Sequence, residues 1–199
     1  ALPYLLDYKG KRGKWNNTDF YQLGYAYYKQ KQYENAITQF NKIIDGNDAV
    51  AQNAYYHLAE SYLNTDKKQQ ALNAFKKASE MQFDAKIQED AYLNYAKLSY
   101  EIGNPYQSVP EIMNAFLAKY PNSASKQEIN TLLISSYITS KNYKEALVLL
   151  EKSKAPENKL AYQKVTFFRG LELYTDGDYK EAYGLFKKSL AENKDKKFT

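Results

Sequence analysis

The stretch YQLGYAYYKQKQYENAITQF, residues 21–40, decides the fold, because three other stretches of the chain follow the same pattern. They span residues 56–75, 132–150 and 168–186. In each stretch a small or apolar residue is followed twelve positions later by an alanine, and four positions further by a phenylalanine or leucine. The anchor pairs are Gly24 and Ala36, Ala59 and Ala71, Ile134 and Ala146, and Gly170 and Ala182. This recurrence at a fixed period predicts a repeat architecture.

A fifth, less regular copy lies at residues 95–116. It fits the pattern when one residue is added at its turn, and Ala96 is then paired with Val109. The second anchors of the five copies are then 35 to 38 residues apart. We therefore expect five repeats that cover roughly residues 17–194.

Each copy reads as two helices. Its apolar residues recur at intervals of three and four, and a short polar stretch such as residues 64–68 or 175–178 divides them into two faces. This pattern predicts an all-α chain of antiparallel helical hairpins, which stack because one hairpin cannot bury both of its faces. We expect the small anchors where the two helices of a hairpin cross closely. The bulky residues expected to fill the groove toward the next unit are Phe40, Phe75, Leu150 and Phe186.

Several residues are predicted to set the helix ends. Asp66, Asn142 and Asp178 precede second helices and can accept hydrogen bonds from free backbone N–H groups as N-caps. Pro105 is expected in the first turn of a second helix. Pro110 is then expected inside that helix, where it would bend or loosen the first turn.

The composition argues against an enzyme. The 199 residues include no cysteine and a single histidine, which excludes thiolate sites and multi-histidine metal centres and argues against a Ser-His-Asp triad. We therefore expect no catalytic residues, no cofactor and no metal, and we interpret His57 as a satisfied side chain beside packing positions. The net charge of +5 comes from scattered residues, so no nucleic acid is expected, and no apolar stretch approaches the ~20 residues needed for membrane insertion.

In the anchor and apolar positions of its repeats the chain resembles the tetratricopeptide repeat family. The best match runs Phe20, Leu23, Gly24, Tyr27, Tyr33, Ala36 and Phe40. The resemblance implies one right-handed superhelical solenoid domain of about five repeats plus a leading half-unit. Its parts are 1–16 (the trailing helix of a truncated repeat and a loop), 17–51, 52–88, 89–126, 127–162 and 163–199 (the fifth repeat and tail). In the half-unit Ala1 and Leu5 stand at the alanine and phenylalanine positions, and longer first helices are expected in the third and fourth repeats.

Most of the 21 tyrosines occupy packing positions of the repeat. The resemblance implies that other positions of the first helices line a concave groove. Alternatively, the tyrosine rings at these positions pack against neighbouring first helices. The candidate groove residues are Tyr21, Tyr25, Tyr28, Asn53, Tyr56, Glu60, Asn64, Asp90, Leu93, Lys97, Glu128, Thr131, Ser135, Lys164, Phe167 and Leu171. Tyrosine offers a large apolar face and a hydroxyl at low entropic cost, which suits a peptide-binding surface.

The leading hypothesis is therefore a non-enzymatic protein–protein interaction scaffold that binds an extended peptide or a partner helix in a tyrosine-rich groove. The alternative is a structural spacer or self-association module of a larger envelope-associated protein. Some tetratricopeptide modules hold a C-terminal carboxylate through lysine and asparagine at two groove positions. Here the first repeat carries Tyr21 and Tyr25 and the second Tyr56 and Glu60, so that pattern is not met.

Residues 106–123 resemble repeats of bacterial cell-envelope scaffold proteins. That resemblance suggests a bacterial periplasm or cell envelope, with the cytoplasm as the alternative.

Overall fold

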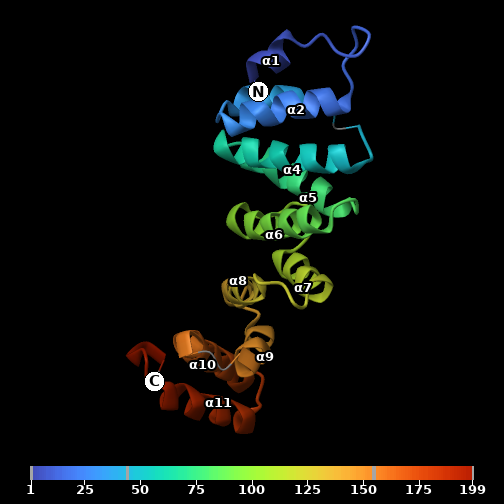
Figure 1. Ribbon diagram of the computed structural model, residues 1–199. Helices are drawn as coiled ribbons and strands as arrows, with labels where there is room; N and C mark the ends of the chain where they lie inside the picture. Colours follow the sequence, from blue (N-terminus) through green and yellow to red (C-terminus); the bar gives the residue numbers. More distant parts are fainter. Residues whose placement is uncertain (1, 44, 154–155, 199) are drawn as a thin grey trace. The chain divides into compact units, whose positions relative to one another are not determined.

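The computed structural model describes residues 2–43, 45–153 and 156–198, which form α-helices joined by turns and two short 3-10 helices (Figure 1). The chain splits into two compact units, Ala1–Gln107 and Ser108–Thr199. The β-type pairing within the described ranges is an isolated bridge between Lys11 and Lys14. The all-α fold predicted from the sequence is confirmed.

The described residues of unit 1 form six helices. They are α1 (Leu2–Asp7), α2 (Asn17–Lys29), α3 (Tyr33–Phe40), α4 (Ala49–Asn64), α5 (Lys68–Glu80) and α6 (Ala85–Ile102). The pairs α2–α3 and α4–α5 pack as hairpins, and α2, α4 and α6 contact one another in succession. First helices of successive repeats therefore share one side of this unit. Helix α1 is the expected half-unit and packs against α2, while Ala1 lies outside the described residues.

Unit 2 contains five α-helices in its described residues. They are α7 (Val109–Lys119), α8 (Lys126–Thr139), α9 (Tyr143–Ser153), α10 (Lys159–Thr175) and α11 (Tyr179–Glu192). The 3-10 turns η1 (Pro156–Asn158) and η2 (Lys196–Phe198) precede α10 and follow α11. Within this unit α7 packs with α8, α8 with α9, α9 with α10 and α10 with α11.

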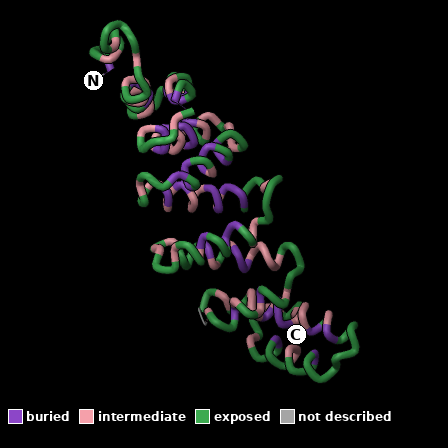
Figure 2. Tube along the Cα trace, turned by 90° about the vertical axis from the view of Figure 1, so that its right-hand side faces the viewer, coloured by how far each residue is buried: buried purple, intermediate pink, exposed green. Residues whose placement is uncertain are grey.

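The core follows the predicted anchors. Figure 2 shows buried positions gathered along the helices and exposed positions on the connecting turns. Ala36 and Ala146 have no exposed surface, and Phe40 and Phe75 are at most 1% exposed. A side chain at Gly24 would place its Cβ 2.7 Å from the Phe40 ring, so the absence of a side chain there lets α2 and α3 approach. The bulky residue thus packs against its own hairpin as well as toward the next one.

Four hairpins share one type of turn. A residue with left-handed backbone occupies the same position in each, namely Lys31, Asp66, Lys141 and Gly177. The N–H of the following residue donates to a carbonyl five residues earlier, for example from Asn142 to Tyr137 at 2.8 Å. This is the Schellman arrangement, which satisfies free carbonyls at the end of the first helix.

This turn changes one cap prediction. Asp178 is an N-cap, and its carboxylate accepts from the N–H of Glu181 at 3.1 Å. Asp66 is not, because it occupies the left-handed turn position and Lys67 directly precedes α5. Asn142 directly precedes α9, as predicted, and its amide nitrogen donates to the Ser140 hydroxyl at 3.2 Å.

The third repeat departs from the predicted register. The residue fourth from the start of its second helix is Ile112, which has no exposed surface, so Ile112 and not Val109 holds the anchor position. Pro105 lies in a loop, since the Asn104 side chain accepts from the N–H groups of the two residues after this proline. Ser108 and Glu111 then form a reciprocal cap. This start places Pro110 in the first turn, where the N–H that proline lacks is not needed.

The expected lengthening of first helices holds for the third repeat only. Helix α6 has 18 residues, whereas α8 has 14, fewer than the 16 of α4. The additional residues before the fourth repeat therefore lie in the connection from α7 to α8.

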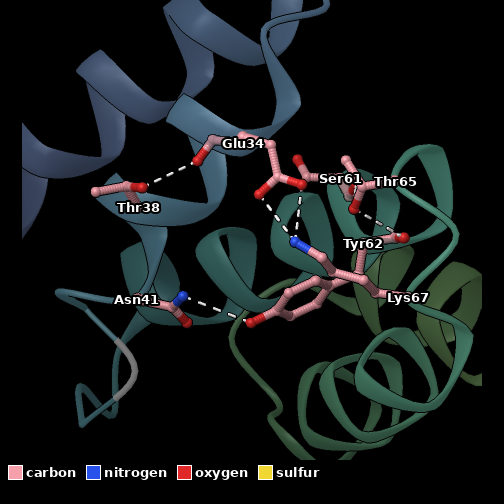
Figure 3. Close-up of polar contacts among 7 residues, drawn as sticks. All are labelled: Glu34, Thr38, Asn41, Ser61, Tyr62, Thr65 and Lys67. Carbon is pink, nitrogen blue, oxygen red and sulfur yellow. Dashed lines mark hydrogen bonds and ion pairs between the residues drawn. The ribbon is translucent and has the colours of Figure 1, made fainter.

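Polar side chains join the first repeat to the second (Figure 3). The Lys67 ammonium contacts both Glu34 carboxylate oxygens at 2.8 Å, and Asn41 donates to the Tyr62 hydroxyl at 3.5 Å. Both partners of the ion pair are at least 36% exposed, so it fixes orientation more than it stabilises.

A buried glutamine closes one repeat in each unit. In unit 1 the Gln52 amide donates to the carbonyls of Ala78, Met81 and Asp84 and accepts from the N–H groups of Phe83 and Asp84. In unit 2 Gln163 donates to the Asp195 carbonyl and accepts from the N–H groups of residues 194 and 195. A first helix thereby satisfies the backbone at the exit of its own second helix.

Candidate binding surface

Helix α2 presents three tyrosines on one face. Tyr21, Tyr25 and Tyr28 are spaced by four and three residues, which places them side by side along a helix. The helix start is fixed by a reciprocal cap between Asn16 and Asp19, with both bonds at 3.0 Å. The ring centroids of Tyr25 lie 6.0 Å from Tyr21 and 6.1 Å from Tyr28, and the planes are nearly parallel.

Helix α4 brings His57 against these rings. Its imidazole centroid lies 5.0 Å from both Tyr25 and Tyr28 and 6.2 Å from Tyr21. Tyr56 on the same helix meets the imidazole edge-on at 5.4 Å. We call these four tyrosines, His57 and Glu60 the tyrosine–histidine cluster.

Glu60 supplies the negative charge of the cluster. Its carboxylate lies 2.8 Å from His57 Nδ1 and accepts a hydrogen bond from the Tyr28 hydroxyl. The side chain is 26% exposed, so the charge is partly withdrawn from water. Glu60 can therefore interact both with the rings beside it and with a group arriving from solvent.

The tyrosine hydroxyls respond to burial and to this charge. Burial, then the neighbouring Tyr25 and Glu60, raise the pKa of Tyr21 to about 12. Burial, then Glu60 and Asp90, raise the pKa of Tyr56 to about 12. Burial and the Glu60 carboxylate also raise the pKa of Tyr28. These three phenols are therefore neutral at physiological pH, and the Tyr28 hydroxyl donates its hydrogen bond to Glu60.

A pocket adjoins the cluster between α1 and α2. It has a volume of about 590 Å³ and is lined by Leu2, Tyr4, Leu5, Tyr21, Gln22, Tyr25, Ala26, Lys29 and Gln30. The Lys29 ammonium lies 5.9 Å from the centroid of the Tyr25 ring. Tyr25 keeps 37% of its surface exposed and so borders both the pocket and the cluster.

The structure brings five of the predicted groove residues together: Tyr21, Tyr25, Tyr28, Tyr56 and Glu60. Asp90 on α6 acts on the Tyr56 hydroxyl through its charge, and Leu93 and Lys97 on the same helix are half-buried. Asn53 and Asn64 instead donate to carbonyls of their own helix, those of Ala49 and Glu60.

The predicted residues of unit 2 form a different surface. Glu128 and Thr131 are exposed on α8, Ser135 is half-buried there, and Lys164 is half-buried on α10. Phe167 packs against Phe168, Phe186 and Phe198, with centroids 5.6, 6.0 and 5.6 Å away. Leu171 is 40% exposed beside a shallow pocket that also includes Arg169. Here the chain's own C-terminal turn covers the aromatic ring.

His57 is the residue of the cluster that sequence reasoning assigned to another role. It is a satisfied side chain beside a packing position, as predicted, because its ring stacks 6.2 Å from that of Phe40, and it also stands at the centre of the tyrosines. The available signal was its spacing from Glu60, three residues later on the same helix face. Its contacts with α2 depend on how two helices pack and have no local signature.

The described residues carry neither a membrane-crossing helix nor a metal-binding group. No helix among them is both long and apolar enough to cross a membrane. They also contain no group of three or more histidine, cysteine or acidic side chains placed to hold a metal ion.

Comparison with known proteins agrees with this architecture. Residues 5–78 match the family model described as anaphase-promoting complex, cyclosome, subunit 3. No curated protein matches the sequence.

Several solved structures resemble most of the chain. YrrB, described as a TPR protein with an unusual peptide-binding site, is 13% identical with a TM-score of 0.51, over 92% of this chain and 89% of its own. MamA is 17% identical with a TM-score of 0.51, over 85% and 94%. The apo form of RapI is 16% identical with a TM-score of 0.53, over 86% and 51%. At these identities the likeness shows the fold, which is that of tetratricopeptide repeat proteins.

Proposed function

We propose that this chain is a non-enzymatic tetratricopeptide repeat scaffold that binds an extended peptide or a partner helix over the tyrosine–histidine cluster. The observation that carries the proposal is the cluster itself. Four tyrosine rings converge on one histidine and one carboxylate, and Tyr25 remains 37% exposed among them. Large, rigid and amphipathic side chains of this kind dominate the energetics of protein interfaces.

Two further observations support the proposal. The matched family model and the solved neighbours indicate no catalytic family, and tetratricopeptide repeats generally mediate protein–protein interactions. YrrB, which shares the fold, is described as having a peptide-binding site. For this chain we correspondingly propose a binding groove on the first helices of the five repeats into which we divide the sequence.

A library of synthetic peptides screened against the intact chain tests the proposal. We expect selected peptides to lose at least about tenfold in affinity when Tyr21, Tyr25 and Tyr28 are all changed to alanine, since a few buried aromatic anchors carry most interface energy. Because Tyr21 and Tyr28 are half-buried, the single change Tyr25→Ser serves as a second variant that should fold normally. Changing Tyr179 and Tyr183, 63% and 65% exposed on α11, is the matched control. Unaltered binding by Tyr25→Ser and by the triple variant would refute the proposal.

The second candidate function is that of a self-association module of a larger envelope-associated protein. Tyr183 directly follows the anchor Ala182 and is 65% exposed. The equivalent residues of the first three repeats are buried: Ile37, Leu72 and Met113 are 7%, 1% and 0% exposed. Leu190 on the same helix is 54% exposed. Light scattering over a hundredfold range of concentration decides: a monomer throughout rejects this candidate, and a dimer broken by Tyr183→Glu supports it.

A further inference from the structure

We propose that the tyrosine–histidine cluster is a subsite for a cationic side chain of the partner, an arginine or lysine that lies on the exposed Tyr25 ring and faces the Glu60 carboxylate. This inference rests on the proposed peptide-binding function and names the chemistry of the peptide. It is a statement about one position of the bound peptide.

The first support is the electrostatic character of the cluster. The Glu60 carboxylate interacts with phenols and an imidazole, including the Tyr28 hydroxyl and His57 Nδ1. A phenol donates a hydrogen bond but does not neutralise a carboxylate charge. The faces of aromatic rings are also negative, so rings and carboxylate together attract a cation and repel a carboxylate. Asp90, whose charge reaches Tyr56, adds to the same sign.

The second support is a cation that the chain itself places here. The Lys29 ammonium lies 5.9 Å from the centroid of Tyr25, within the range of a cation–π contact. A ring that accepts an exposed lysine of its own chain can accept an arginine of a partner. The guanidinium is planar and stacks on aromatic faces better than an ammonium does. Lys29 and the partner's cation then compete for the same ring.

The third support is that the acidic position belongs to one repeat. The residues equivalent to Glu60 in the other four repeats are Tyr25, Lys97, Ser135 and Leu171. A carboxylate therefore stands beside clustered tyrosines in the second repeat alone. This places the cationic residue of the peptide at a single register.

Paired peptides that differ only in charge test the inference. The probes are the acetylated and amidated pentapeptide Gly-Ser-Arg-Gly-Ser and its counterpart with citrulline, a neutral isostere of arginine. Each is titrated into the ¹⁵N-labelled chain at pH 7.5. We expect the arginine peptide to shift backbone amide signals of residues 21–28 and 56–60 and to bind about tenfold more tightly than the citrulline peptide.

Two variants assign the preference to the proposed groups. Glu60→Gln keeps the size and hydrogen-bonding capacity of the side chain, and it should bring the affinity of the arginine peptide closer to that of the citrulline peptide, while the Tyr25 ring still favours the cation. Lys29→Met removes the competing cation and should strengthen arginine binding about two- to fivefold. Lys42→Met is the matched control, because Lys42 lies over Phe20, at 4.8 Å from its centroid, away from the cluster. The amide spectra report at the same time that each variant is folded.

The outcomes separate this inference from the proposed function. Equal affinities of the two peptides for the wild type, or an arginine preference that is undiminished in Glu60→Gln, overturn the cationic subsite. If library peptides without a basic residue still bind at Tyr25, the subsite is refuted while the peptide-binding function stands. If no peptide shifts residues 21–28, both are refuted.

Discussion

The surface formed by α2 and α4 in unit 1 and the surface formed by α10 in unit 2 are built from the same repeat pattern but differ in character. Tyr21 and Phe167 occupy equivalent positions, three residues before Gly24 and Gly170. Around Tyr21 the rings gather at a histidine and a carboxylate, and Tyr25 stays exposed. Around Phe167 the rings gather with Phe198 of the C-terminal turn, centroids 5.6 Å apart. The repeat pattern determines which positions of a first helix lie on this surface. Single residues outside the pattern, such as Phe198, determine whether the surface is exposed to solvent.

The largest expected effect tests the backbone support behind the two surfaces. Gln52→Ala leaves buried carbonyls and N–H groups at the end of α5 without partners, and we expect it to lower the unfolding free energy by about 3 kcal/mol. Gln163→Ala removes fewer hydrogen bonds and should cost about 2 kcal/mol. Urea unfolding measures both changes, with Gln127→Ala, an exposed glutamine on α8, as the control. Equal and small losses at all three glutamines would contradict the structural role assigned to the two buried amides.

The packing layer of the hairpins is expected to be equally tight in both units. Ala36→Leu in unit 1 and Ala146→Leu in unit 2 each overpack a fully buried helix crossing and should cost roughly 1–3 kcal/mol. Thermal unfolding gives the loss, and Ala118→Leu at an exposed position of α7 is the control. An unchanged melting midpoint for Ala146→Leu would count against the repeat register in unit 2.

Removal of the ring that covers Phe167 should make the two surfaces more alike. Phe198→Ala takes away contacts with Phe167 and Phe168, and we expect a loss of about 1–2 kcal/mol together with stronger binding of a fluorescent hydrophobic dye. Phe83→Ala, at a ring that is already 50% exposed, is the control. Dye binding that does not increase in Phe198→Ala would mean that this ring is not what closes the surface.

The hairpin turns offer a smaller effect that should have opposite signs within unit 2. Lys141 adopts φ of 61° and Gly177 φ of 88° at the same turn position. Lys141→Gly relieves a left-handed side chain and should stabilise by about 0.5 kcal/mol after the entropy of the unfolded chain is counted. Gly177→Ala should destabilise by about 1 kcal/mol. Urea midpoints provide the measurement, and the same sign for both variants would contradict the shared Schellman geometry.

A pH dependence that belongs to unit 1 provides the last comparison. Because the pKa values of Tyr21 and Tyr56 are raised to about 12, the unfolded chain ionises first as the pH rises above 10. Their contribution to stability is therefore complete below pH 10 and is lost by about pH 12. The double variant Tyr21→Phe, Tyr56→Phe should lose less stability than the wild type between pH 9 and pH 11, by urea unfolding. Tyr174→Phe, 58% exposed in unit 2, should behave as the wild type does.

The regular repeats could be predicted from the sequence because their signals are local. Intervals of three and four residues and the twelve-residue step from Gly24 to Ala36 specify two helices and a turn. The buried Ala36 and Phe40 confirm the roles assigned to them. The third repeat was less predictable, since its long loop depends on the Asn104 side chain holding the backbone of residues 106 and 107. Alignment on one added residue chose Val109, whereas the reciprocal cap at Ser108 places Ile112 at the anchor.

The turn residues show a second limit of sequence reasoning. Asp66 has a side chain that suits an N-cap, but Lys67 occupies the position before α5. The reason is that the N–H of Lys67 must donate to the carbonyl of Tyr62 to close the turn, which places Asp66 at the left-handed position. Lys31 and Lys141 adopt the same backbone without any of the residue types that favour it. The geometry of the hairpin therefore overrides the local preference at this position.

The sequence by itself determined the all-helical repeats and the side of each first helix on which the candidate residues lie, because helical periodicity is written in neighbouring residues. Only the tertiary structure decided which of those residues act together. His57 meets Tyr25 and Tyr28 because α2 and α4 pack side by side, and Phe198 covers Phe167 because the chain turns back after α11. Such contacts join residues about thirty positions apart, and their strength depends on burial and distance, which no local pattern records.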